Sequence, residues 1–122
     1  MLGSARRCMF CSEEVKRHIL MEQGTVYVIE DLYPVTHGHL LIIPFRHTQD
    51  YFSMTDEERL DSQQVLIALR EQITRYDSTV QGFNIGINCG SVAGQSVLHA
   101  HIHLIPRREG IGLFNKHFDY LR

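Results

Sequence analysis

The N-terminal half of the chain contains three apolar stretches with the character of β-strands. Residues 18–22 and 25–30 are separated by Gln23-Gly24, and the second stretch is rich in β-branched and aromatic residues, so together they predict a hairpin. Pro34 should end this pattern, because it constrains the residue before it and cannot donate to a sheet. The near-continuous apolar run of residues 38–44 then predicts a central strand that is covered on both faces.

The second half begins with a helix signal. Thr55-Asp56-Glu57-Glu58 has the form of a capping box with acidic residues in the first turn, and it predicts a long helix to about Tyr76. Helical spacing then predicts an apolar stripe that packs on the sheet and a charged face in solvent. The stripe comprises Leu66, Leu69, Ile73 and Tyr76, and the solvated residues are Glu58, Asp61, Arg70, Glu71 and Arg75.

Two further strands are expected after this helix, at residues 82–88 and 98–105, the second ended by Pro106. A short helical turn with Ser12 as its cap is expected near the N-terminus. One principal helix is thus inserted among about five strands and does not alternate with them. We therefore predict an α+β fold, with a roughly five-stranded antiparallel sheet packed by one long helix, and residues 1–122 as a single domain.

Composition narrows the choice of partners. The formal net charge is −2 and charged residues make up 21% of the chain, which argues against a general DNA-binding or membrane-surface protein. No apolar run is long enough for a signal peptide or a membrane span, so we expect a cytoplasmic location. Any phosphate that the protein binds must then be held by local groups.

The candidate chemistry lies near the C-terminus, in His99-Ala100-His101-Ile102-His103. On a strand, a spacing of two places all three imidazoles on one face and the apolar residues between them on the other. Polar rings crowded on one face are difficult to bury without partners, so a functional site is a better explanation than a structural one.

This run resembles the signature of the histidine triad (HIT) family of nucleotide hydrolases and transferases. The resemblance extends to the preceding Gly94-Gln95-Ser96-Val97, to Asn88 and to the segment from Asp31 to His47. It implies a HIT-like fold in which the sheets of two chains join across a homodimer. We therefore expect the long helix and the strand that follows it to contribute to the dimer contact.

The resemblance also implies the activity. A nucleotide, with adenine or guanine as its base, would be cleaved at the α-phosphate through a nucleotidyl intermediate on His101, the middle histidine. The substrate would be a dinucleoside polyphosphate or a nucleoside phosphoramidate. His99 and His103 would complete the catalytic triad, and Ser96 would pass a proton to the leaving group.

Nucleotide binding is assigned on the same basis. Asp31 would hold the ribose hydroxyls and His39 would support the triad, while neutral side chains and the two later triad members surround the phosphates. This expected binding set is Asp31, His39, Asn88, Gln95, Ser96, His101 and His103. Taken alone, Asn88 and Ser96 fit turn chemistry around Gly90 and Gly94 almost as well, and Asp31 fits an ordinary turn aspartate.

Cys8-x-x-Cys11 indicates half of a metal site. In the zinc-carrying members of the HIT family, histidines at the positions of His47 and His99 complete the ligand set. The resemblance therefore implies a structural zinc held by Cys8, Cys11, His47 and His99, with no open position for water. The alternative is a pair of buried cysteines without metal.

Two other functions remain open at this stage. Three closely spaced histidines are also compatible with a catalytic zinc that generates hydroxide, as in a metal hydrolase. A nucleotide-binding module without turnover is the other possibility.

Overall fold

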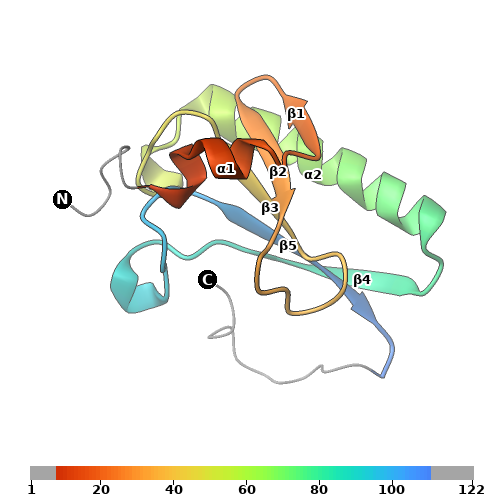
Figure 1. Ribbon diagram of the computed structural model, residues 1–122. Coiled ribbons are helices and arrows are strands. Elements are labelled where there is room, and N and C mark those ends of the chain that lie inside the picture. Colours follow the sequence, from red (N-terminus) through yellow and green to blue (C-terminus); the bar gives the residue numbers. More distant parts are fainter. Residues whose placement is uncertain (1–7, 111–122) are drawn as a thin grey trace.

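A five-stranded antiparallel sheet forms the centre of the structure, a computed structural model that describes residues 8–110 (Figure 1). Its spatial order is β1-β2-β3-β5-β4. With its long helix, this sheet confirms the predicted α+β fold. The strands are β1 (Met21–Gln23), β2 (Val26–Glu30), β3 (Leu40–Pro44), β4 (Val80–Gly86) and β5 (Ile102–Arg108).

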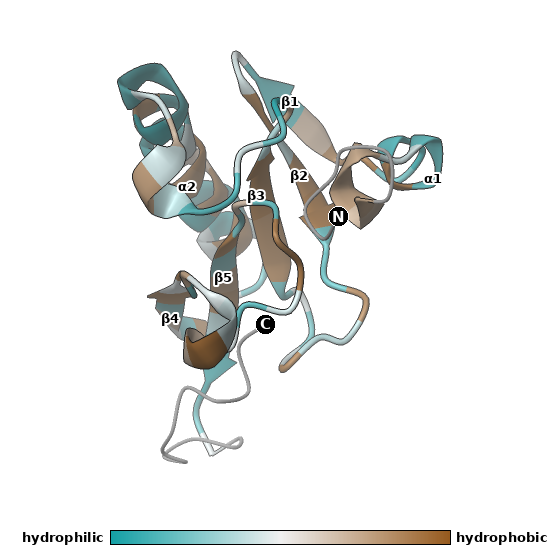
Figure 2. Ribbon diagram, turned by 90° about the vertical axis from the view of Figure 1, so that its left-hand side faces the viewer, coloured by the Kyte–Doolittle hydropathy of each residue, from teal (hydrophilic) through white to brown (hydrophobic). Residues whose placement is uncertain are grey.

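The two faces of the sheet are covered by different parts of the chain. Helix α2 (Asp56–Tyr76) lies on one face, and the short helices η2 (Met9–Cys11) and α1 (Glu13–Lys16) lie on the other (Figure 2). β3 is buried along its whole length, as its apolar run predicts. The core under α2 includes Val28, Ile42, Val65, Leu69 and Leu104, and the opposite core includes Phe10, Val15, Tyr27, Leu41 and Ile43.

Helix α2 begins at the predicted capping box, with Thr55 Oγ1 accepting from the Glu58 N–H and the Glu58 carboxylate accepting from the Thr55 N–H. Two side-chain predictions for this helix are wrong. Glu58 is 3% exposed because its carboxylate receives two hydrogen bonds from Arg46. Tyr76 is 78% exposed, and the buried row runs instead through Ser62, Val65 and Leu69.

The bounds of β5, the strand predicted to carry the three histidines, also differ from the prediction. β5 starts at Ile102, because the Ala100 N–H donates to the Thr48 carbonyl (2.8 Å) and pairing with β3 begins only at Ile102. Pro106 does not end this strand, which continues to Arg108. The pairing of β5 with β3 stops at Leu104, so the backbone of Pro106 has no β3 residue opposite it. The Pro106 carbonyl accepts from Thr36 Oγ1 instead. The missing N–H of the proline therefore removes no hydrogen bond from the sheet.

The first hairpin is shorter than predicted. α1 is capped by Ser12 as expected, but the His18 N–H still bonds to the Val15 carbonyl, so the first strand begins only at Met21. β4 starts two residues earlier than predicted, at Val80. The remaining short helices are η3 (Tyr51–Ser53) and η4 (Ser91–Ala93). Across residues 8–110, no helix combines the length and the apolar character needed to cross a membrane.

Candidate functional site

The three triad histidines are all buried, at 0%, 3% and 0% exposure for His99, His101 and His103. Only His103 lies within β5, while His99 and His101 occupy the segment before it. This segment is held against the loop after β3 by the bond from Ala100 to Thr48. Each histidine bonds to different partners, and these partners determine what each ring can do.

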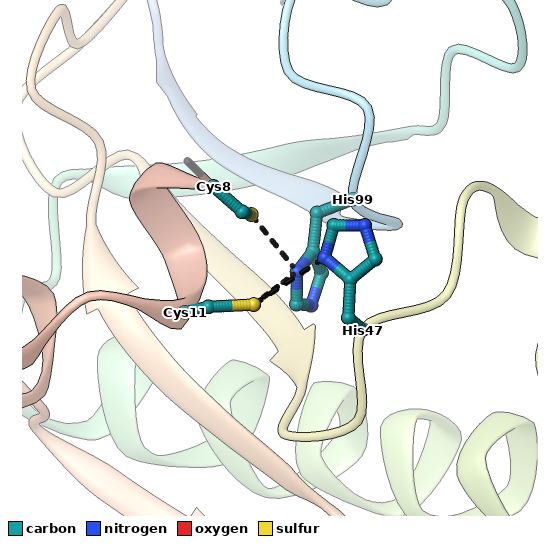
Figure 3. Close-up of side chains that lie close together, drawn as sticks. All are labelled: Cys8, Cys11, His47 and His99. Carbon is teal, nitrogen blue, oxygen red and sulfur yellow. Dashed lines mark hydrogen bonds between the residues drawn. The ribbon is translucent and has the colours of Figure 1, made fainter. Parts of the chain in front are cut away.

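His99 belongs to a group that we name the metal cluster: Cys8, Cys11, His47 and His99 (Figure 3). One potential ligand atom from each residue lies within 4.8 Å of the others. His99 Nδ1 lies 3.2 Å from Cys8 Sγ and 3.5 Å from Cys11 Sγ, and His47 Nδ1 lies 3.3 Å from Cys11 Sγ. Sulfur and nitrogen ligands of one tetrahedral zinc are about 3.5 Å apart, so this donor set fits zinc.

The environment of the metal cluster favours a cation. Burial raises the pKa of Cys11 to about 11, with the neighbouring Cys8 adding to the effect, so the thiolate form needs a positive charge beside it. Burial lowers the pKa of His99 to about 4, which keeps this ring neutral. His99 Nε2–H donates to the Pro44 carbonyl (2.8 Å), and this bond leaves the Nδ1 lone pair directed at the sulfurs.

His103 belongs to a second group, which we name the relay: Asp31, His39 and His103. The Val35 backbone N–H donates to His39 Nδ1 (3.0 Å), so the hydrogen of the neutral His39 ring is on Nε2. That nitrogen donates to His103 Nδ1 (2.9 Å) and lies 3.4 Å from Asp31 Oδ2. Neutral His103 therefore carries its hydrogen on Nε2.

Charge in the relay is set by burial. Burial lowers the pKa of His39, and Arg107 acts in the same direction while Asp31 opposes them, so His39 is neutral near pH 7. The relay also has donor atoms close enough for a metal ion. A nitrogen that carries a hydrogen cannot be a metal ligand, however, so the hydrogen bond from Val35 makes His39 Nε2 a donor to His103 and not a ligand.

His101 belongs to neither group. Its Nδ1–H donates to the carbonyl of His99 (2.7 Å), so the lone pair of neutral His101 is on Nε2. No metal-ligand group within residues 8–110 contains His101 or joins two triad histidines. A neutral ring held in this way can act as a nucleophile, and the triad histidines form no shared metal-ligand group within residues 8–110.

A cavity of about 1160 Å³ lies against His101 and His103. Asp31 and Ser96 also line it, and its remaining walls are largely apolar. The apolar lining includes Phe10, Val15, Ile19, Ile29, Leu32 and Val97. An apolar pocket with a few convergent polar groups is typical of a site for a small organic ligand with a polar end.

Not every predicted binding residue reaches this cavity. Gln95 is 3% exposed, and its amide bonds to the Gly90 N–H and to the carbonyls of Gln49 and Val97, so it braces the loop before the triad. Asn88 is half-buried after β4, and it does not line this cavity either.

The two arginines after the triad, Arg107 and Arg108, do not line this cavity and bond to other parts of the chain. Arg107 bonds to Asn84, and Arg108 bonds to Asp77, Thr79 and the His37 carbonyl. Of the histidines outside these groups, His18 and His37 are exposed, and His117 lies outside the described residues.

Sequence reasoning missed the backbone groups that fix His99 and His39. The Pro44 carbonyl and the Val35 N–H leave no signal in residue types. Phe10 was also missed. Its position between the two cysteines was the one available signal.

Comparison with known proteins is consistent with this geometry. A model of the HIT domain matches residues 12–110. The chain belongs to the HIT family. Its triad, the metal cluster and the relay are therefore features of a HIT protein.

Three similar proteins bear on the chemistry of this HIT chain. AP-4-A phosphorylase of Mycobacterium tuberculosis is 36% identical over 89 residues, which cover 70% of this chain and 44% of that protein. A diadenosine triphosphate hydrolase of Plasmodium falciparum has a TM-score of 0.72 at 28% identity, over 78% of this chain and 64% of that one. A zinc-bound histidine triad family protein of Mycobacterium smegmatis has a TM-score of 0.71 at 32% identity, over 90% of this chain and 81% of that one.

Proposed function

We propose that the protein cleaves a nucleotide at its α-phosphate, with His101 as the nucleophile. The observation that carries the proposal is the 2.7 Å bond from His101 Nδ1–H to the His99 carbonyl, in a ring that lines the cavity. It gives the lone pair to Nε2, the only nitrogen of this ring that can attack. The names of the mycobacterial phosphorylase and the Plasmodium hydrolase support a dinucleoside polyphosphate as the substrate, and a nucleoside phosphoramidate is the other candidate.

The reaction has two displacement steps. The Nε2 lone pair forms a bond to the α-phosphorus while the bond to the leaving group breaks. The leaving group takes the electron pair of that bond and a proton from bulk water, which in this proposal passes through Ser96, a residue that lines the cavity. Water then attacks the same phosphorus and loses a proton to bulk water, and the electron pair of the P–N bond returns to Nε2 as the nucleotide leaves. The positive charge that develops on the His101 ring in the first step is stabilised by the His99 carbonyl.

The relay serves the phosphoryl oxygens in this proposal. His103 Nε2–H is a neutral donor beside the nucleophile, and His39 holds its tautomer through the 2.9 Å bond. A fixed neutral donor stabilises the charge of the transition state without the cost of a buried cation. Asp31 lines the cavity with one oxygen already bonded to the Tyr33 N–H (2.8 Å), and its other oxygen lies toward His39 and His103. We retain Asp31 as the group that meets the ribose hydroxyls.

For the metal cluster we propose a structural zinc. A Cys₂His₂ set fills all four positions of a tetrahedral ion, so zinc would supply bracing of the segment before β5 and no activated water. The zinc-bound mycobacterial relative supports this choice of ion.

We also infer a homodimer. β4 is an outer strand of the sheet, and Ile85 on it is 57% exposed. Ile67 on α2 is also 57% exposed. An unpaired edge strand with apolar neighbours is protected when it pairs with an identical edge. Equilibrium sedimentation at micromolar concentration tests this, and a mass near that of one 14.1 kDa chain would contradict it.

A substrate panel tests the activity. Radiolabelled dinucleoside polyphosphates and phosphoramidates with adenine or guanine are mixed with the protein, quenched with alkali within one turnover and digested. We expect label on the peptide that contains His101, because phosphohistidine survives alkali. Turnover without a covalent adduct would support hydroxide attack instead, and tight binding without turnover would indicate a binding module.

A further inference from the structure

The ring of Phe10 lies between the metal cluster and the proposed nucleophile. Its centroid is 5.8 Å from that of His99 with an interplanar angle of 84°, and 5.1 Å from that of His101 at 70°. Both are edge-to-face contacts, the arrangement that aromatic rings prefer. Phe10 is 2% exposed, so its ring is closely packed.

The backbone of Phe10 is fixed from two directions. It is part of η2, between Cys8 and Cys11, so an ion bound by both sulfurs fixes the chain on each side of it. Its carbonyl accepts a 2.6 Å hydrogen bond from Tyr27 Oη. Tyr27 is 1% exposed on β2, and burial raises the pKa of its hydroxyl, which therefore remains a donor.

We propose that Phe10 is a positioning residue that couples occupancy of the metal cluster to the orientation of the His101 ring. This inference rests on the proposed role of His101. Metal binding fixes Cys8 and Cys11, the chain between them then fixes the Phe10 ring, and that ring limits rotation of His101. Rotation would break the bond from Nδ1–H to the His99 carbonyl and release the other tautomer, in which Nε2 carries the hydrogen and cannot attack.

A second route from the metal to His101 must be separated from this one. His99 is itself a member of the cluster, and its carbonyl accepts from His101. Phe10→Leu removes the ring contacts but keeps both cysteines, His99 and an apolar side chain. Any change at His101 in the zinc-loaded variant therefore comes from the ring of Phe10.

The experiment is ¹⁵N NMR of the histidine rings at pH 8, on zinc-loaded and chelator-treated protein. In the zinc-loaded wild type we expect His101 in the Nδ1–H form. In zinc-loaded Phe10→Leu we expect the tautomer ratio to shift by about tenfold, the worth of one edge-to-face contact. The matched control is Phe45→Leu, since the Phe45 ring contacts the Tyr27 ring (centroids 4.9 Å apart) and contacts no histidine ring among residues 8–110. An unchanged His101 in zinc-loaded Phe10→Leu would overturn the proposal.

Tyr27→Phe decides the matter if Phe10→Leu fails to fold or to retain zinc. It removes only the hydroxyl that holds the Phe10 carbonyl, and Tyr27 does not line the cavity. We expect the same direction of tautomer shift, with kcat lowered about fivefold and KM unchanged. A change in KM alone, with the His101 signals of wild type, would contradict the coupling. The NMR result does not depend on turnover, so it tests the coupling even if the proposed reaction is wrong. Failure of the proposed reaction would show separately, as an active His101→Ala variant.

Discussion

The metal cluster and the relay each gather potential metal ligands around a triad histidine, but the hydrogen bonds to their rings differ. Each contains a buried triad histidine, His99 in one and His103 in the other, and each has donor atoms within 4.8 Å of one another. They differ in the backbone group that bonds to one ring nitrogen of His99 in the metal cluster and of His39 in the relay. A carbonyl accepts from His99 and leaves a lone pair for a metal, whereas an N–H donates to His39 and leaves a hydrogen on the nitrogen that faces His103.

The polarity of the backbone partner thus distinguishes a histidine that can be a metal ligand from one that donates a proton. The soft sulfur atoms of the metal cluster act in the same direction, because zinc prefers thiolate to carboxylate. His101 lies between the two groups and bonds to the backbone of His99. The predictions below alter one group at a time.

The largest effect is expected at His101, which belongs to neither group. His101→Ala should lower kcat by about 10⁴ while substrate binding and zinc content are retained, because the covalent route is lost. Steady-state kinetics and calorimetric binding measure the two quantities. His37→Ala, which alters an exposed histidine, is the control and should be fully active. Substantial turnover by His101→Ala would remove it from the role of nucleophile.

Next in size is loss of the metal cluster. Cys11→Ser should abolish stoichiometric zinc and lower the free energy of unfolding by about 3–4 kcal/mol, the contribution of a ligand present at 100 to 1,000 times its Kd. Metal analysis and chemical denaturation test this. Cys89→Ser is the matched control, since Cys89 lies outside the cluster. Wild-type protein that is free of zinc and equally stable with and without added zinc would contradict the site.

The relay should affect rate without affecting metal. His39→Ala removes the donor that fixes His103, and we expect kcat to fall about 100-fold, typical for a lost proton-positioning group, with zinc content unchanged. His39→Gln offers an amide N–H in place of Nε2–H and should recover part of the loss. If His39→Ala instead releases zinc, the two groups are not separate.

The smallest effect is expected at Glu58, which holds Arg46 beside His47, a member of the metal cluster. Burial alone would raise the pKa of Glu58, but the bonds from Arg46 and Thr55 lower it below the ordinary value. A lowered carboxyl pKa in the folded state contributes stability that is present above the ordinary pKa and is lost as pH falls through the folded value.

Glu58→Gln should therefore lower the free energy of unfolding by about 1–2 kcal/mol at pH 7, and the difference from wild type should vanish in acid. Denaturant titrations at pH 7 and at low pH check this, with Glu57→Gln, an exposed neighbour, as the control. A difference that persists unchanged in acid would mean that the carboxylate charge is not responsible.

Much of the fold could be predicted from sequence because its signals are local. The capping box at Thr55 and the apolar run of β3 are short-range patterns, and both elements form where they indicate. Glu58 and Pro106 were misplaced because their surroundings come from other segments: Arg46 pairs with Glu58, and the pairing of β5 with β3 stops at Leu104, before Pro106.

The candidate site divides in the same way. Residue types and family resemblance named all four members of the metal cluster, which the structure brings together. They did not indicate that Gln95 is used in bracing its own loop, or that Asp31 faces the relay. They also gave no tautomer for His39 or His99, because the partners that decide it, the Val35 N–H and the Pro44 carbonyl, are backbone groups that residue types do not reveal.

The most direct test of the division between the two groups is a ¹⁵N map of the histidine rings in zinc-loaded protein at neutral pH. We predict three different states along the triad: His99 bound to metal through Nδ1, His101 with hydrogen on Nδ1, and His103 with hydrogen on Nε2, beside a His39 that also carries hydrogen on Nε2. A metal-shifted signal at His39 Nε2, or a His101 ring with its hydrogen on Nε2, would contradict the account.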